Sequence, residues 1–123
     1  DWEATLRHAF DDAEFDRWLA AGDHRADFFG RIVATARRYN ARHERTGLVA
    51  ADALAMAVAL DPSIVTRSEK RAVAVELDGR LTRGATVVDW AARLGRPAQA
   101  NIVLEVDQAR FAAMVKRALG VPA

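Results

Sequence analysis

The sequence predicts an α/β fold: helices over about residues 11–60, then a small three-stranded β region, then one terminal helix. Three observations lead to this prediction. Apolar residues recur at helical spacing before residue 60, alternate with polar residues between 73 and 106, and return to helical spacing after Asp107. The 123 residues are enough for a single core, so we treat residues 1–123 as one segment.

Two amphipathic helices are expected first. Asp11 and Asp12 precede apolar residues at helical spacing, and Gly22 is a typical helix end, which predicts a capped helix between them. A longer helix is expected over about 25–45, closed by Gly47. Its apolar residues share one face and its arginines the opposite face: Phe28, Phe29, Ile32, Val33 and Ala36 against Arg31, Arg37, Arg38, Arg42 and Arg45.

The helix expected at 53–60 has no polar side chain at all. Asp52 precedes it, and Asp61-Pro62-Ser63 ends it, because the residue before a proline is disfavoured in a helix. A helix without a polar face must be covered on every side. Two amphipathic helices and a small sheet give too little cover, so we infer that a larger sheet outside this chain packs against it.

Three short strands and a last helix complete the predicted fold. The strands are expected around Val73–Leu77, Thr86–Trp90 and Ile102–Val106, with a turn at Asp78-Gly79 after the first. Asp107 then caps a helix with one apolar stripe, formed by Phe111, Met114, Val115, Ala118 and Leu119.

Composition is that of an ordinary globular protein and excludes several kinds of site. Hydrophobic residues make up 51% of the chain, and its formal charge of +1 favours neither a nucleic-acid partner nor an acidic chaperone. The absence of cysteine excludes disulfides, thiolate zinc sites and cysteine nucleophiles. No apolar run approaches the ~20 residues that cross a bilayer, and no signal-peptide pattern opens the chain, so we expect a cytoplasmic protein without a membrane partner.

Asp52 is the most prominent candidate for chemistry, and on composition alone it reads as a helix N-cap, worth about 1 kcal/mol over alanine. A lone aspartate cannot hold a metal, since calcium takes about 6–8 oxygen ligands. None of the three histidines has the spacing of a metal site, and no serine stands in a nucleophile elbow.

The basic run RRYNARHER, residues 37–45, gives a second candidate. A positive helix with an interleaved tyrosine can meet phosphates or stack on bases, although surface arginines are more often simply solvated. Tyr39 follows the apolar stripe loosely, so core packing with an outward hydroxyl is the default expectation.

Three separated blocks resemble one known family: GLVAADALAMAVALDPSIVT (47–66), ELDGRLTRGATVVDW (76–90) and NIVLEVDQARF (101–111). In this order they are similar to the C-terminal part of the nucleoside hydrolases, the inosine-uridine preferring family, and most like its animal-type branch. The resemblance covers nearly the whole chain. It implies the C-terminal part of an open-sheet α/β fold, with the N-terminal sheet of that fold absent from this chain.

The resemblance also implies an activity. Family members hydrolyse the N-glycosidic bond of ribonucleosides to free base and ribose, using a calcium ion that holds ribose hydroxyls and a water. Asp52 matches the late aspartate that ligates calcium and contacts a ribose hydroxyl, and Tyr39 matches a tyrosine on a mobile helix that closes over the nucleoside. Family members often have a histidine just before the late aspartate, where it assists departure of the base. In this chain that position is Ala51. Dimers or tetramers are common in the family, so a homo-oligomer is expected.

Two hypotheses about function follow from the residues that match the family and from those that depart from it. The family's aspartate cluster, D-T-D-x-G-x-D-D, is absent, and Asp1 opens the chain without an initiator methionine. We therefore expect a segment that completes a calcium-dependent hydrolase together with the N-terminal part of the same protein, and that is inactive in isolation. The alternative is a catalytically inactive homologue or fragment that binds nucleosides or serves assembly. Base preference is not predicted.

Overall fold

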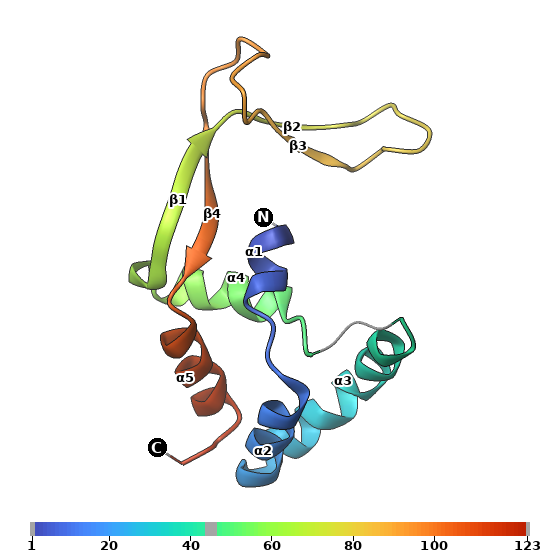
Figure 1. Ribbon diagram of the computed structural model, residues 1–123, viewed down its shortest axis with the longest axis vertical. Helices are drawn as coiled ribbons and strands as arrows, with labels where there is room; N and C mark the ends of the chain where they lie inside the picture. The colour runs from blue at the N-terminus through green and yellow to red at the C-terminus, as the bar shows by residue number, and fades with distance from the viewer. Residues whose placement is uncertain (1, 44–46, 123) are drawn as a thin grey trace.

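The computed structural model describes residues 2–43 and 47–122, and its elements follow the predicted order of helices, strands and a last helix (Figure 1). The first half holds the helices α1 (Trp2–Arg7), α2 (Asp12–Ala21), α3 (His24–Arg42) and α4 (Ala51–Leu60). After a single 3-10 turn, η1 (Pro62–Ile64), come β1 (Val65–Arg71), β2 (Val73–Val75), β3 (Thr86–Val88), β4 (Ala100–Val106) and α5 (Gln108–Ala118).

The β region differs from the predicted three strands. Within the described residues it has four strands in two antiparallel pairs, β1 with β4 and β2 with β3. Strand β1 was missed because only Val65 among its seven residues is apolar, so it shows no alternation. It forms instead by pairing along β4, from Val65 opposite Val106 to Arg71 opposite Ala100. The β2–β3 hairpin extends from the end of this pair, away from α5 (Figure 1).

Local signals place the starts of α2 and α5 as expected. The Asp11 carboxylate accepts a hydrogen bond from the Glu14 amide at 3.0 Å, and the Asp107 carboxylate accepts one from the Arg110 amide at 3.0 Å. Helix α3 ends at Arg42, and the expected continuation to Arg45 falls on residues 44–46, outside the described part of the chain.

Gly47, expected to end the helix before it, instead allows two backbone segments to approach closely. Its φ of +85° is in the left-handed region, and a Cβ there would lie 2.5 Å from the Phe10 carbonyl oxygen. Leu48 and Phe10 exchange two backbone hydrogen bonds at 3.0 and 2.8 Å. The glycine therefore lets the chain that enters α4 pair closely with the chain that enters α2.

The core lies between α2, α4 and α5. Phe10 contacts Trp18 and Phe111, with ring centroids 4.9 and 5.0 Å apart, and Phe15 and Ile64 are fully buried beside them. Helix α3 contributes less than its apolar stripe predicts. Its Phe29 and Val33 pack against the core, whereas its Phe28 and Ile32 are more than half exposed.

Helix α4 is also covered on one side only. Leu54 and Ala57 are buried, while Met56 is 58% and Leu60 70% exposed. The apolar face of α4 is therefore open among the described residues, and a sheet from outside the chain that covers it stays a prediction.

No helix in the described part of the chain is long and apolar enough to span a membrane.

Candidate functional site

The start of α4 carries the two candidate residues Ala51 and Asp52, and the structure corrects the expectation that Asp52 is the N-cap. Ala50 occupies the cap position, with no side-chain capping bond, and α4 already begins at Ala51. A capping residue needs a non-helical backbone, which Ala50 has at φ −116° and ψ 65°. Asp52 instead lies inside the first helical turn with its side chain exposed.

The Asp52 carboxylate differs from the aspartates at other helix starts. Each of those accepts a hydrogen bond from a backbone amide two or three residues further along: Asp11, Asp23, Asp61 and Asp107. Across residues 2–43 and 47–122, the Asp52 side chain has no hydrogen bond or ion pair. A negative charge in the first turn is favoured by the helix dipole. Within the described residues, therefore, nothing occupies this carboxylate.

A groove beside this helix start brings Ala51 against α1 and the strands. It has a volume of about 430 Å³ and lies between α1, α4, β3 and β4. Its walls are mainly apolar, with Leu54 and Val58 from α4 and Ile102 from β4, and Asn101 is one of its few polar residues. The Ala51 methyl group offers no proton donor to anything bound there.

Tyr39 is not in the core, contrary to expectation. It lies near the end of α3, beyond the part that packs on α2, and is 56% exposed. Its ring stacks against His43, with centroids 4.2 Å apart and planes at 32°, and His43 Nδ1 lies 2.8 Å from the Tyr39 carbonyl oxygen. Among the described residues no hydrogen bond or ring contact joins Tyr39 to Asp52, and a shared site for the two stays a prediction.

The described residues do not form a complete metal site. Within them, no three His, Asp or Glu side chains gather closely enough to hold an ion. Asp52 can offer two carboxylate oxygens, and calcium takes about 6–8 oxygen ligands. The described residues alone therefore do not fit a calcium site at α4.

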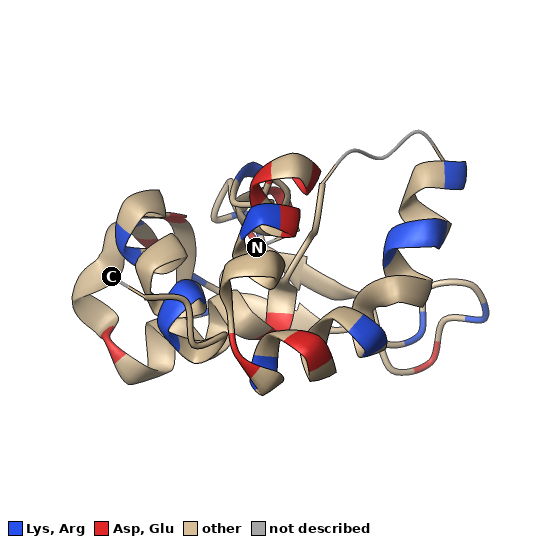
Figure 2. Cartoon of the chain, turned by 90° about the horizontal axis from the view of Figure 1, so that it is seen from below, with Lys and Arg blue, Asp and Glu red and all other residues tan. Residues whose placement is uncertain are grey.

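The basic face of α3 is partly neutralised. Arg37 pairs with Asp12 at 2.9 Å and with Asp16 at 2.6 Å, and its hydrogen bond lowers the pKa of Asp16. Arg38 and Arg42 remain exposed near the end of α3, and Figure 2 shows blue Lys and Arg positions along that end of the helix. One charge of the basic run 37–45, that of Arg37, is thus neutralised by α2, and residues 44–46 lie outside the described part.

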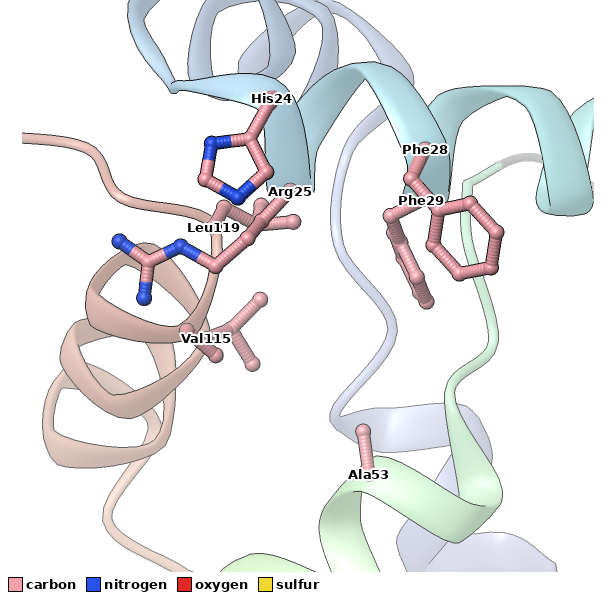
Figure 3. Close-up of a pocket in the computed structure, with 8 residues that line it drawn as sticks. His24, Arg25, Phe28, Phe29, Ala53, Val115 and Leu119 are labelled. Atoms are coloured by element: carbon pink, nitrogen blue, oxygen red, sulfur yellow. The ribbon is translucent and has the colours of Figure 1, made fainter.

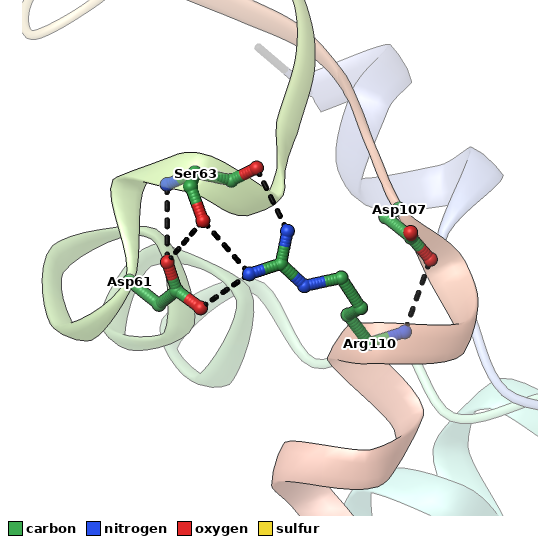
Figure 4. A network of polar contacts seen from close by, with 4 residues as sticks. All are labelled: Asp61, Ser63, Asp107 and Arg110. Atoms are coloured by element: carbon green, nitrogen blue, oxygen red, sulfur yellow. Dashed lines mark hydrogen bonds and ion pairs between the residues drawn. The ribbon is translucent and has the colours of Figure 1, made fainter.

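The sequence analysis did not identify two polar clusters, and both of them hold segments of the fold together. Arg110 of α5 donates to Asp61 at 2.7 Å and to the Ser63 hydroxyl at 2.8 Å, joining α5 to the end of α4 (Figure 4). The buried Asp89 accepts backbone bonds from Arg93 and Leu94, which lower its pKa. The Asp-Pro-Ser sequence was a signal for the first cluster, since aspartates before such turns bond the amide two residues on.

A second groove, of about 390 Å³, lies between α3, α4 and α5 (Figure 3). Phe28, Phe29, Val115 and Leu119 make it apolar. Arg25 at its edge is held by Asp23, and that ion pair lowers the pKa of Asp23 to about 2. His24 also lines the groove (Figure 3); its side chain is exposed, with Nδ1 3.8 Å from the Asp23 carboxylate.

Comparisons with known proteins agree on one family. The model of the inosine-uridine preferring nucleoside hydrolase family matches residues 1–113. The non-specific ribonucleoside hydrolase RihC of Salmonella paratyphi A is 42% identical over 69 residues, which is 56% of this chain and 22% of that protein. RihC of Salmonella typhimurium is 41% identical over 69 residues, again 56% of this chain and 22% of the relative.

A solved structure extends the likeness to the fold. The inosine-guanosine nucleoside hydrolase (IG-NH) superposes with a TM-score of 0.77 at 30% identity, over 99% of this chain and 38% of that one. The expected fold and resemblance are confirmed by these findings. The chain spans about a fifth, 22%, of the length of the curated relatives it matches.

Proposed function

Since this chain belongs to the inosine-uridine preferring nucleoside hydrolase family, we propose that it forms the C-terminal part of a nucleoside hydrolase active site. The reaction is hydrolysis of the N-glycosidic bond of a ribonucleoside to free base and ribose. The family match over residues 1–113 is the observation that carries this proposal. The likeness to a solved nucleoside hydrolase at 30% identity supports it.

In the proposed reaction, water attacks the anomeric carbon of the ribose while the bond from that carbon to the base nitrogen breaks. The ribose passes through a state with oxocarbenium character, and the bonding electron pair leaves with the base. The attacking water gives up one proton as its oxygen bonds to the anomeric carbon, and one proton must reach the departing base in the same step or soon after. Ala51 cannot supply it, so in this protein the donor is another group.

Asp52 is proposed to contact the ribose. Its exposed carboxylate, with no partner among the described residues, can accept a hydrogen bond from a ribose hydroxyl. It is also proposed as one ligand of the Ca²⁺ that the family resemblance implies. The remaining ligands would come from the N-terminal part of the same hydrolase, since this chain alone does not fit the ion.

Tyr39 is proposed as a second substrate contact. One face of its exposed ring stacks on His43, and an aromatic side chain held in this way can present its edge or other face to a nucleoside. Closure of α3 over the substrate would bring the ring there. A cytoplasmic homo-oligomer is the proposed setting.

A catalytically inactive, nucleoside-binding or assembly role is the second candidate. Ala51 at a position often held by histidine favours it, and so does the lack of a metal cluster in the described residues. Nucleoside binding without release of base by the complete protein would support this role over hydrolysis.

The test compares Asp52→Asn with Asp27→Asn in the complete hydrolase, with base release from inosine and uridine measured at several calcium concentrations. Asp27 is a matched control, because it is an exposed carboxylate in the first turn of α3. Asp52→Asn should lower turnover on the order of 100-fold and weaken calcium binding, since loss of even an outer-shell partner of a metal ligand costs about 10–100-fold. Asp27→Asn should leave both unchanged.

Equal rates and calcium dependence in the two variants would remove the ligand assignment from Asp52. The 123-residue chain alone should release no base, and calcium-dependent release by it would contradict the proposal that other residues complete the site.

A further inference from the structure

The turn of the β2–β3 hairpin, residues 76–85, belongs to one of the three blocks that resemble the family, and it has no part in the proposed reaction. It is the far end of an arm, the yellow loop at the right of Figure 1. The Glu76 amide donates to the Ala85 carbonyl at 3.0 Å, and the Gly84 amide to the Glu76 carbonyl at 2.7 Å. A two-stranded hairpin alone is at best marginally stable in water, so further contacts would stabilise this arm.

Leu81 forms an apolar knob on this turn. At 99% it is the most exposed large apolar side chain of the described residues. Arg80 and Arg83 lie on either side of it in the sequence, and both are exposed. Within the described residues neither guanidinium has a hydrogen bond or an ion pair. The Leu81 knob therefore stands between two positive charges that have no partner in that part of the chain.

An apolar hollow lies further back on the same hairpin, with a volume of about 350 Å³. Ala74, Val75, Leu77 and Val87 give it its apolar lining, and the last three are 52%, 71% and 48% exposed. A cavity of about 150 Å³ can hold benzene, so this hollow has room for a leucine side chain. Leu81 of the same chain does not line it.

The rim of this hollow has a net negative charge. Glu76 and Asp78 bring two carboxylates to it, and Arg96 brings one guanidinium. The Glu76 carboxylate accepts the amides of Asp78 and Gly79 at 2.8 and 3.0 Å, which lowers its pKa and keeps it charged at neutral pH. The Asp78 side chain is exposed and has no hydrogen bond or ion pair within residues 2–43 and 47–122.

The knob and the hollow complement each other, but not within one chain. Backbone bonds from Arg83 to Gly79 and from Ala85 to Thr82, at 3.1 and 2.8 Å, hold the turn, so the knob does not fold back onto its own hollow. A twofold dimer uses the same surface of both copies and therefore needs a surface that is complementary to itself. This hairpin has an apolar knob between positive charges and an apolar hollow with a negative rim, which meets that need.

We propose that the β2–β3 hairpin docks a second copy of this chain, with the Leu81 knob of each copy seated in the hollow of the other. The arginines beside each knob then meet the carboxylates on the rim of the other copy. This contact gives a surface to the homo-oligomer proposed above. It rests on the geometry of the hairpin, so it stands whether or not the chain takes part in nucleoside hydrolysis.

Sedimentation equilibrium of the 123-residue chain measures this association. A contact between two hairpins is small beside the ~1,200–2,000 Å² of stable complexes, so we expect a reversible dimer with a Kd between about 1 µM and 1 mM. Leu81→Asp should raise the Kd at least about tenfold, because it brings a charge into an apolar hollow. Leu60→Asp is the matched control on α4, since Leu60 is 70% exposed, and it should leave the Kd unchanged.

Three results of this measurement would overturn the proposal. One is a chain that stays monomeric up to about 1 mM. Another is a dimer with the same Kd after Leu81→Asp. The third is a dimer lost with Leu60→Asp but kept with Leu81→Asp, which would place the interface on the open face of α4. Circular dichroism checks that both variants keep the fold of the parent chain, as expected for substitutions of exposed side chains.

Exchange of charges tests the rim separately from the knob. Asp78→Arg should weaken the dimer, and so should Arg80→Asp combined with Arg83→Asp, because each change places like charges opposite one another. An equimolar mixture of the two variants should associate about tenfold more tightly than either variant alone, since opposite charges then meet again. A mixture that associates no more tightly would contradict the proposed pairing.

Two measurements need no substitution. In a mixture of ¹³C-labelled and unlabelled parent chain, NOEs should join the Leu81 methyl groups to those of Leu77 or Val87 on the other copy, and a dimer without them overturns the proposal. In the complete hydrolase, the amides of residues 77–81 should be protected from exchange in the oligomer. Protection in a monomer would mean that the rest of the same protein covers the hairpin. Base release is not measured in any of these experiments, so failure of the proposed hydrolysis would leave their results unchanged.

Discussion

Helices α4 and α5 pack against each other, yet their starts differ in how the polar groups are bonded. At the start of α5 the polar groups bond each other: Asp107 caps the helix, and Arg110 ties it to Asp61 and Ser63. At the start of α4, Asp52 has no partner among the described residues, and Met56 and Leu60 further along are exposed. The comparison separates residues that stabilise this chain by bonding within it from residues that have no partner, or no apolar cover, among the described residues.

The largest expected effect is on the buried side of α5. Phe111 is 1% exposed and packs on Phe10, so Phe111→Ala should lower the free energy of unfolding by about 3–5 kcal/mol. Phe28→Ala is the matched control, since Phe28 is 58% exposed, and it should cost within about 1 kcal/mol. Urea unfolding of the two variants measures the difference, and similar midpoints would mean that the core is not where the structure places it.

Loss of the carboxylate should destabilise the chain at the start of α5 and have little effect at the start of α4. Asp107→Ala removes a capping bond and should lower the free energy of unfolding by about 1 kcal/mol. Asp52→Ala removes no bond among the described residues and should change it by less than about 0.5 kcal/mol. Thermal unfolding at neutral pH compares them. A loss at Asp52 equal to that at Asp107 would mean that Asp52 has a structural partner after all.

The difference between local and long-range contacts explains which elements could be predicted from the sequence. The ends of α2 and the start of α5 were predicted because a capping aspartate and an apolar period are local signals. Strand β1 was not, because its polar residues are ordered by pairing with β4, which is distant in sequence. Local reasoning also failed at Asp52, because the helix begins one residue before it and the cap falls on Ala50.

The candidate site was predicted from the family resemblance rather than from periodicity. Composition gave Asp52 a structural role and Tyr39 a place in the core, and neither agrees with the structure. Residues with a functional role can have no partner within their own chain, so neither packing nor capping rules identify them. The hydrogen bonds of the buried His8 with Val106 and Gln108 were equally hidden, since these residues are 98 and 100 positions away in the sequence.

Acid should act more on the α5 junction than on α4. The hydrogen bond from the Ser63 hydroxyl, followed by its amide and the charge of Arg110, lowers the pKa of Asp61 below its ordinary 3.8. A carboxyl group with a lowered pKa stabilises the folded chain above its ordinary pKa, and that contribution is lost as the pH falls through the lowered value. Asp61→Asn should therefore unfold with a weaker pH dependence below pH 3.8 than the parent chain.

Asp52→Asn is the control for this measurement, and it should follow the parent chain because no bond of the described residues is lost. Unfolding followed by circular dichroism between about pH 5 and pH 2 covers the range in which carboxylates titrate. An unchanged acid transition in Asp61→Asn would show that the Asp61–Arg110 junction adds nothing to stability.

The smallest expected effect is on the open face of α4, and it is also the one that most sharpens the comparison. Met56 is 58% exposed, so Met56→Ala in the 123-residue chain should change the free energy of unfolding by less than about 0.5 kcal/mol. If a sheet from the rest of a hydrolase covers this face, the same substitution in the complete protein should cost about 2–5 kcal/mol, as a buried methionine does. Equal and small effects in both would mean that the apolar face of α4 stays uncovered, and the cover predicted from its composition would then be wrong.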